Sequence, residues 1–125
     1  MIVGINFMTA ANNTCEVIFN GKTYPCPISM AMDLIGGKWK GVILYYLVDS
    51  SKRFSELKQD MPTITEMTLS MQLKQLERDG FISRTVYGAK PPIKVIYELT
   101  ELGHSFKPVL ETLSLWSHQI ARQKA

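Results

Sequence analysis

The sequence predicts an α+β fold in which a helix runs directly into a β-hairpin. The helix is expected at residues 65–79, where leucines recur at three- and four-residue spacing and define one buried face. The hairpin is expected from two β-rich runs, residues 81–87 and 93–99, which a short Gly-Ala-Lys-Pro-Pro connection joins. A helix followed at once by a basic hairpin is the recognition-helix-and-wing layout of a winged helix-turn-helix.

The boundaries of this helix are marked by its flanking residues. Pro62 stops the preceding segment, and either Thr63 or Thr65 can cap the new N-terminus. Glu66 stands three residues after Thr63, which is the spacing of a capping box. Gly80 is expected to end the helix in a left-handed conformation. The inward face consists of Leu69, Leu73 and Leu76.

Length and composition indicate a globular chain. The 125 residues include 46% hydrophobic and 20% charged residues, which excludes a disordered protein and suffices for a core without disulfides. No apolar run approaches the ~20 residues that cross a membrane, and we recognise no signal peptide. We therefore expect a cytoplasmic protein with reduced cysteines. Residues 1–25 are interpreted as an N-terminal extension and residues 26–125 as the winged helix-turn-helix domain.

Basic charge gathers in the middle of the chain. The net charge is only +3, but the sole charges between Phe81 and Tyr97 are the three basic residues Arg84, Lys90 and Lys94. Residues 38–58 carry five basic and two acidic side chains, whereas residues 98–125 balance three acids with three bases. This distribution fits a surface that faces phosphates, although an ordinary solvated face remains the alternative.

Three segments are expected within the first 37 residues. Residues 1–13 lack a clear period and are interpreted as an arm or an extra strand, whereas residues 15–24 predict a hairpin because Asn20-Gly21 suits a type I′ turn. Residues 28–35 predict a short helix that Gly36-Gly37 ends.

A further helix is expected at residues 38–48 and to be buried on most sides, because Leu44 and Tyr45 widen its apolar stripe. That stripe consists of Trp39, Val42, Ile43, Tyr46 and Leu47. Arg53-Phe54 is interpreted as a short strand, followed by Ser55 as the cap of a helix at residues 56–61. This short helix, with Leu57 and Met61 inward, and the helix at residues 65–79 would form the helix-turn-helix.

The last helix carries more apolar surface than one domain needs. Thr100 is its expected cap, and Pro108 predicts a kink or break, because proline removes the bond to the carbonyl of His104. The long stripe either packs on the chain's own first helices or forms a dimer interface. We favour the dimer, because helix-turn-helix proteins usually read paired half-sites. The expected interface consists of Phe106, Val109, Leu110, Leu113, Trp116 and Ile120.

Between Cys26 and Trp116 the chain resembles the HxlR-type winged helix-turn-helix regulators. The motifs that carry the resemblance occur in order: Cys26-Pro27, Asp33-Leu34-Ile35-Gly36-Gly37-Lys38-Trp39-Lys40, Arg53-Phe54-Ser55-Glu56-Leu57, Leu73, Leu76-Glu77, Asp79-Gly80, Arg84, Tyr87, Pro91-Pro92, Tyr97-Glu98-Leu99-Thr100-Glu101-Leu102-Gly103 and Pro108-Val109-Leu110. The resemblance implies a bacterial cytoplasmic homodimer that binds double-stranded operator DNA. It also implies a small-molecule or electrophile effector, since some relatives sense electrophiles or oxidants through the cysteine that matches Cys26. The second, C-terminal cysteine of some sensors is missing here, so any disulfide would join Cys15 to Cys26 or link two subunits.

The exposed face of the expected recognition helix departs from the family pattern. A helical wheel places Met67, Met71, Lys74 and Arg78 outward, and outward methionines are unusual on a solvent face. They either contact thymine methyl groups in the major groove or pack against protein.

We therefore expect a homodimeric DNA-binding transcriptional regulator, with residues 65–79 in the major groove and residues 81–99 on the backbone or minor groove. The alternative is a winged-helix protein-interaction module that does not read DNA. The expected DNA-binding residues are Lys38, Lys40, Arg53, Ser55, Thr65, Thr68, Ser70, Met71, Lys74, Arg84, Lys90 and Lys94.

Catalytic and metal chemistry finds no support in the sequence. His104 and His118 lie about 21 Å apart along one helix, so they cannot share a metal ion within one chain. We expect no catalytic residue, no cofactor and no metal site. Cys26, just before a helix and near Lys38 and Lys40 in sequence, is either a redox-sensing thiol with Cys15 as partner or a small core residue.

Overall fold

The computed structural model describes residues 15–122, and the chain divides after Gly37 into two compact units. The first unit ends at Gly37, so it includes the helix that the sequence analysis assigned to the winged helix-turn-helix domain. The interpretation of residues 1–13 as an arm or a strand lies outside the described residues. Within residues 15–122, no helix combines the length and apolar character that crossing a bilayer requires.

The first unit consists of a hairpin and one helix. Strands β1 (Val17–Phe19) and β2 (Lys22–Tyr24) pair antiparallel, and α1 (Pro27–Ile35) follows. Asn20 and Gly21 both have positive φ angles, of 50° and 76°, so the expected type I′ turn is confirmed. The buried Tyr24 donates its hydroxyl to the Asp33 carboxylate at 2.7 Å, which ties β2 to α1.

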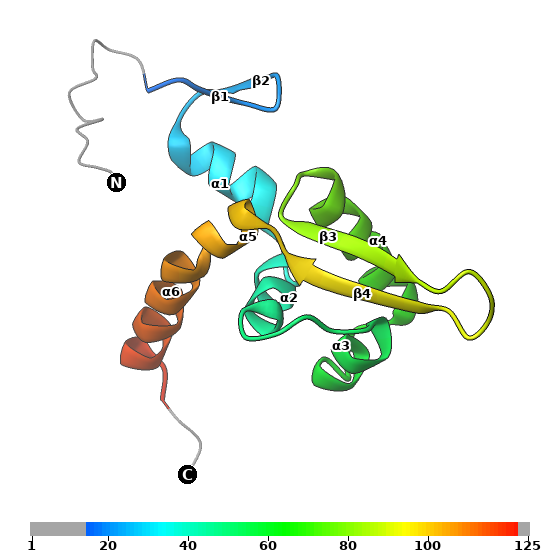
Figure 1. Ribbon diagram of the computed structural model, residues 1–125. Helices are drawn as coiled ribbons and strands as arrows, with labels where there is room; N and C mark the ends of the chain where they lie inside the picture. The colour runs from blue at the N-terminus through cyan, green and yellow to red at the C-terminus, as the bar shows by residue number, and fades with distance from the viewer. Residues whose placement is uncertain (1–14, 123–125) are drawn as a thin grey trace. The chain divides into compact units, whose positions relative to one another are not determined.

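The second unit is a three-helix arrangement closed by a hairpin and completed by two C-terminal helices (Figure 1). Its elements are α2 (Lys40–Leu47), α3 (Phe54–Asp60), α4 (Glu66–Arg78), β3 (Ile82–Tyr87), β4 (Lys94–Leu99), α5 (Glu101–Ser105) and α6 (Lys107–Ile120). Its fully buried core is aliphatic: Ile43, Leu44, Leu47, Leu57, Ile64, Leu69, Leu73, Leu76 and Ile82. Helices α3 and α4 form the helix-turn-helix, and β3–β4 form the wing.

Helix α4 ends as the sequence predicts. Gly80 has a φ angle of +89°, and the backbone N–H groups of Gly80 and Phe81 donate to the carbonyls of Glu77 and Leu76 at 3.0 and 2.9 Å. These two bonds satisfy carbonyls that the helix leaves free, and they turn the chain directly into β3. The Thr100 hydroxyl donates to the Gly80 carbonyl, so the end of β4 is fastened to the end of α4.

The expectation of a short strand at Arg53-Phe54 is wrong. The β-type pairing lies one residue earlier and involves a single residue. The β-type contact is a single bridge at Lys52, whose backbone N–H donates to the Tyr97 carbonyl at 2.9 Å while the Tyr97 N–H donates back at 2.8 Å. Phe54 already belongs to α3. The bridge places a third chain segment beside β4.

The expected cap of α3 is wrong, whereas one of the two residues expected to cap α4, Thr65, is confirmed. Ser55 is not the cap of α3, because the helix begins at Phe54 and Arg53 holds the cap position, where its N–H donates to Glu56 Oε1 at 2.7 Å. The Thr63–Glu66 capping box does not form. Thr65 caps α4 instead, and its hydroxyl oxygen accepts from the Thr68 N–H at 3.1 Å.

Helix α2 is less buried than expected and starts at Lys40 rather than residue 38. Ile43, Leu44 and Leu47 are in the core, but Val42 is exposed and Tyr45 is 55% exposed. Only one side of α2 faces the core. Bulky apolar residues on the remaining sides of the helix do not make those sides buried.

The C-terminal helix is interrupted, as Pro108 predicts. Thr100 caps α5, Phe106 forms the junction, and Pro108 lies in the first turn of α6, where its missing N–H leaves no bond broken.

Candidate nucleic-acid interface

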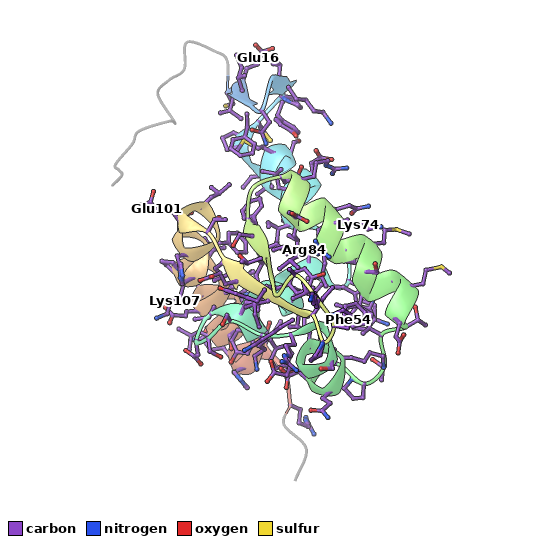
Figure 2. All side chains as sticks on the ribbon, turned by 45° about the vertical axis from the view of Figure 1, so that its right-hand side comes forward. Glu16, Phe54, Lys74, Arg84, Glu101 and Lys107 are labelled. Atoms are coloured by element: carbon purple, nitrogen blue, oxygen red, sulfur yellow. The ribbon has the colours of Figure 1, made fainter. Side chains whose placement is uncertain are left out.

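The outer face of the helix-turn-helix carries a shallow groove of about 620 Å³ between the start of α3 and α4. It is lined by Phe54, Glu66, Met67, Ser70, Met71 and Lys74. The structure thus brings together three of the expected DNA-binding residues, Ser70, Met71 and Lys74. Figure 2 shows Lys74 projecting outward from α4, with Phe54 at the beginning of α3.

The orientation of α4 agrees with the helical wheel. Leu69, Leu73 and Leu76 are at most 1% exposed, whereas Met67 and Met71 are 77% and 50% exposed. Lys74 and Arg78 are exposed as well, and Ser70 is half-buried. The leucine face anchors α4 in the core, and the opposite face is left free for a ligand.

The wing presents its basic residues to solvent. Arg84 lies on β3, Lys90 lies in the connection between the strands, and Lys94 opens β4; all three are exposed. In Figure 1 the hairpin tip reaches beyond the helices of the second unit, as a wing that follows a DNA backbone would.

The remaining expected DNA-binding residues are dispersed. Thr65 and Thr68 are joined at the N-terminus of α4, where the Thr65 hydroxyl donates to Thr68 Oγ1 at 2.9 Å. Arg53 and Ser55 are exposed at the start of α3. Lys38 and Lys40 lie at the start of α2, and none of the residues that line the groove belongs to α2. Lys38 Nζ lies 4.9 Å from the centroid of the Trp39 ring.

An ion pair links the end of α3 to Lys52, the residue that pairs with β4. Lys52 Nζ lies 2.9 Å from Asp60 Oδ2, at the end of α3, while the Lys52 backbone pairs with β4. The Lys52 ammonium donates a hydrogen bond to the Asp60 carboxylate, and this bond raises the pKa of Lys52 above its ordinary value. Lys52 therefore contacts α3 through its side chain and β4 through its backbone.

An exposed apolar stripe runs along α6. Val109, Leu113, Trp116 and Ile120 follow one another at four-, three- and four-residue spacing, and all are exposed, Trp116 by 57%. Leu110 differs from the expectation, because it is only 7% exposed and packs within its own chain. Phe106 is half-buried. In Figure 1, α6 lies on the side of the second unit away from α4.

A second groove, of about 650 Å³, lies between α2 and α6. Tyr45, Leu110, Leu115 and His118 are among its lining residues. Both Tyr45 and Leu115 are exposed, so the apolar surface near α6 is wider than the expected stripe.

Cys26 caps α1 in the first unit. The Ser29 N–H donates to Cys26 Sγ at 3.4 Å, and Ser29 Oγ lies 3.6 Å from the same sulfur. Hydrogen bonding with the Ser29 side chain, and then with the Ser29 backbone N–H, lowers the pKa of the Cys26 thiol below its ordinary value. Cys26 is half-buried, and Cys15 is exposed; both are free thiols.

Two residues of the groove, Phe54 and Glu66, are not among the DNA-binding residues expected from the sequence. The pattern around Phe54 predicts a strand, and Glu66 has the spacing of a capping residue. Met67 is expected to point outward with Met71 but is not among the residues expected to bind DNA, although it stands one helical turn before Met71 and lines the same groove. No group of three or more potential metal-ligating side chains gathers anywhere in residues 15–122.

Taken together, the helix-turn-helix, its exposed α4 face and the basic hairpin define a winged helix-turn-helix DNA-binding protein. The family model of HxlR-like helix-turn-helix proteins matches residues 34–125, so the chain belongs to that family. It is a transcriptional regulator of the helix-turn-helix type.

Individual relatives support this assignment. The chain is 48% identical over 94 residues to the uncharacterized HTH-type transcriptional regulator YdeP of Bacillus subtilis (strain 168), a match that covers 75% of this chain and 73% of YdeP. Among solved structures, the redox regulator HypR in its oxidized form matches with a TM-score of 0.73 and 40% identity, covering 78% of this chain and 100% of HypR. The reduced form of the transcriptional regulator YodB from B. subtilis matches with a TM-score of 0.68 and 35% identity, covering 80% of this chain and 98% of YodB.

Proposed function

We propose that the protein acts as a homodimer on operator DNA, with α4 in the major groove and the wing on the backbone or in the minor groove. The observation that carries this proposal is the exposed face of α4, which combines Met71 and Lys74 with the polar Ser70 opposite the buried leucines. An α-helix fits the major groove, where side chains such as these can reach base edges. The proposal places the protein in the cytoplasm, where bacterial DNA lies, and assigns it no catalysis.

The proposed dimer rests on the α6 stripe. Four exposed apolar side chains in one line are costly to leave in water, and a second α6 would cover them. Because α6 lies on the side of the second unit away from α4, a dimer built on α6 leaves both α4 faces free for two half-sites (Figure 1).

The direct test is to select fragments of the source genome on the immobilised protein and to measure their affinity against salt. DNA binding predicts a steep fall of affinity with salt, because neutralised phosphates release counterions. Protein-interaction modules lack that dependence. If no fragment is bound above background, the protein-interaction alternative, with the methionine face binding protein, becomes the better account of α4.

Replacing Lys90 and Lys94 together by alanine is expected to weaken binding to all DNA sequences alike. Both side chains are exposed on the wing and are proposed to contact phosphates, so the slope of log affinity against log salt should fall by about two units. Fluorescence anisotropy on specific and random duplexes measures this. Lys107→Ala, on α6, is the matched control and should leave the slope unchanged (Figure 2). An unaltered slope in the wing variant would remove the wing from the interface.

We also propose Cys26 as the group through which an electrophile or oxidant modulates DNA binding. The lowered pKa raises its thiolate fraction at neutral pH, and the thiolate is the reactive form. The relatives HypR and YodB, named as a redox regulator and as a transcriptional regulator solved in reduced form, are compatible with this proposal.

Alkylation kinetics test the cause of this reactivity. Iodoacetamide forms a sulfur–carbon bond with the thiolate and releases iodide, so its rate follows the thiolate fraction. Ser29→Ala removes the hydroxyl but keeps the N–H, so the apparent pKa of Cys26 alkylation should rise and the rate at neutral pH should fall. Both the reference protein and the Ser29→Ala variant carry Cys15→Ser, so that only Cys26 is alkylated. An unchanged pH profile would assign the lowered pKa to the helix N-terminus alone.

A further inference from the structure

Three of the six residues that line the groove on α4 are apolar, although a DNA-facing surface is usually polar. Met67 and Met71 are largely exposed, stand one turn apart, and share the groove with the half-buried ring of Phe54. Apolar methionine side chains that stay in contact with water forgo the favourable free energy of burial that an apolar partner would supply. Three adjoining apolar side chains at one end of a proposed DNA-contacting face therefore call for an apolar partner.

The major groove of DNA offers one such group. The C5-methyl of thymine is the only apolar substituent that the four base pairs display there. Methionine is unbranched and polarizable, so two methionines can close around a methyl group without a preformed pocket. We propose that the groove formed by Phe54, Met67 and Met71 is a binding site for a thymine C5-methyl group, and that it makes the protein select thymine at one position of each half-site. This inference rests on the proposed function and specifies what α4 reads.

The polar residues of the groove restrict where that methyl can lie. Glu66, in the first turn of α4, is exposed and repels phosphates, so this end of the groove suits a base edge rather than the backbone. Lys74 supplies a cation at the other end of the lining, two turns further along α4, where a guanine edge or a phosphate can accept from it. Ser70 lies between them and can bond to any base.

The test replaces thymine by uracil, which removes the methyl group and keeps every hydrogen-bonding group. A bound fragment is prepared with each thymine of one half-site changed to uracil in turn, and affinities are measured by anisotropy. One position should weaken binding about fourfold, since burying one such carbon is worth ~0.8 kcal/mol at ~1.4 kcal/mol per factor of ten. Uracil at the matching position of both half-sites should weaken binding about 16-fold.

Protein variants show whether the methionines cause the effect. With Met67→Ala and Met71→Ala combined, the ratio of thymine to uracil affinity should move to about one. Met71→Leu keeps an apolar side chain of similar volume and should keep the ratio. Lys74→Ala, in the same groove, should weaken both DNAs equally and leave the ratio unchanged. All substituted side chains are exposed, so the folds of the variants should persist.

The outcomes separate this inference from the proposed function. If the wild-type protein binds selected fragments but no uracil substitution changes its affinity, the thymine site is overturned while operator binding stands. If the uracil effect survives in the double methionine variant, the methyl acts through DNA shape, and the inference again fails. If no fragment is bound at all, both proposals fall together.

Discussion

Replacing Leu73 by alanine is expected to lower the free energy of unfolding by about 2–5 kcal/mol. Leu73 is only 1% exposed and lies at the centre of the leucine face that holds α4 against the core. Truncation removes buried methyl groups and leaves a cavity, because the surrounding aliphatic side chains can close it only in part. Urea denaturation followed by circular dichroism measures the change.

Met71→Ala is the matched control, since it shortens an apolar side chain two residues away on the opposite face of α4. Met71 is 50% exposed, so the free energy of unfolding should change by no more than about 0.5 kcal/mol. Its affinity for a selected fragment should fall instead, whereas folded Leu73→Ala should bind normally. If Met71→Ala lost stability and Leu73→Ala lost DNA affinity instead, α4 would be rotated about its axis from the orientation described.

Trp116→Asp is expected to convert the proposed dimer to monomers and to abolish specific DNA binding at the same time. Trp116 is 57% exposed within the α6 stripe, so in a dimer it would be covered by the second chain. A carboxylate placed there would be desolvated without a partner, which costs several kcal/mol. One half-site gives a monomer too few contacts, so operator affinity should be lost with the dimer. Light scattering and anisotropy on the same samples measure both effects.

The control for this variant is Gln119→Asp, which adds the same charge to an exposed position of α6 outside the apolar stripe. It should remain dimeric and bind DNA. A monomeric Trp116→Asp protein with normal operator affinity would show that the dimer is not needed for DNA recognition. A dimeric Trp116→Asp protein would place the interface elsewhere.

Local patterns were enough to predict the elements that position the candidate site. The leucine spacing oriented α4, because a 3.6-residue period leaves one face to bury. Asn20-Gly21 and Gly80 identified a turn and a helix end, because positive φ angles favour these residue types. Pro108 identified the division between α5 and α6 through its missing N–H. Each of these patterns determines the structure of only the few residues next to it in the chain.

The features that sequence reasoning placed wrongly depend on partners that are distant in the chain. The bridge at Lys52 exists because Tyr97 of β4 supplies both backbone partners, and this pairing leaves Phe54 free to open α3. Tyr45 is exposed, and Leu110 is buried, because packing between α2 and α6 decides which side of each helix the core covers.

The sequence by itself therefore determined the winged helix-turn-helix order, the inward face of α4 and the basic wing. Only the tertiary structure showed that Phe54 of α3 and Met67 and Met71 of α4 line one groove. Helical periodicity orients residues of one helix relative to each other, but it says nothing about which residue of another helix lies beside them. That juxtaposition is set by the packing of α3 and α4 on a shared core, through Leu57, Leu69 and Leu73.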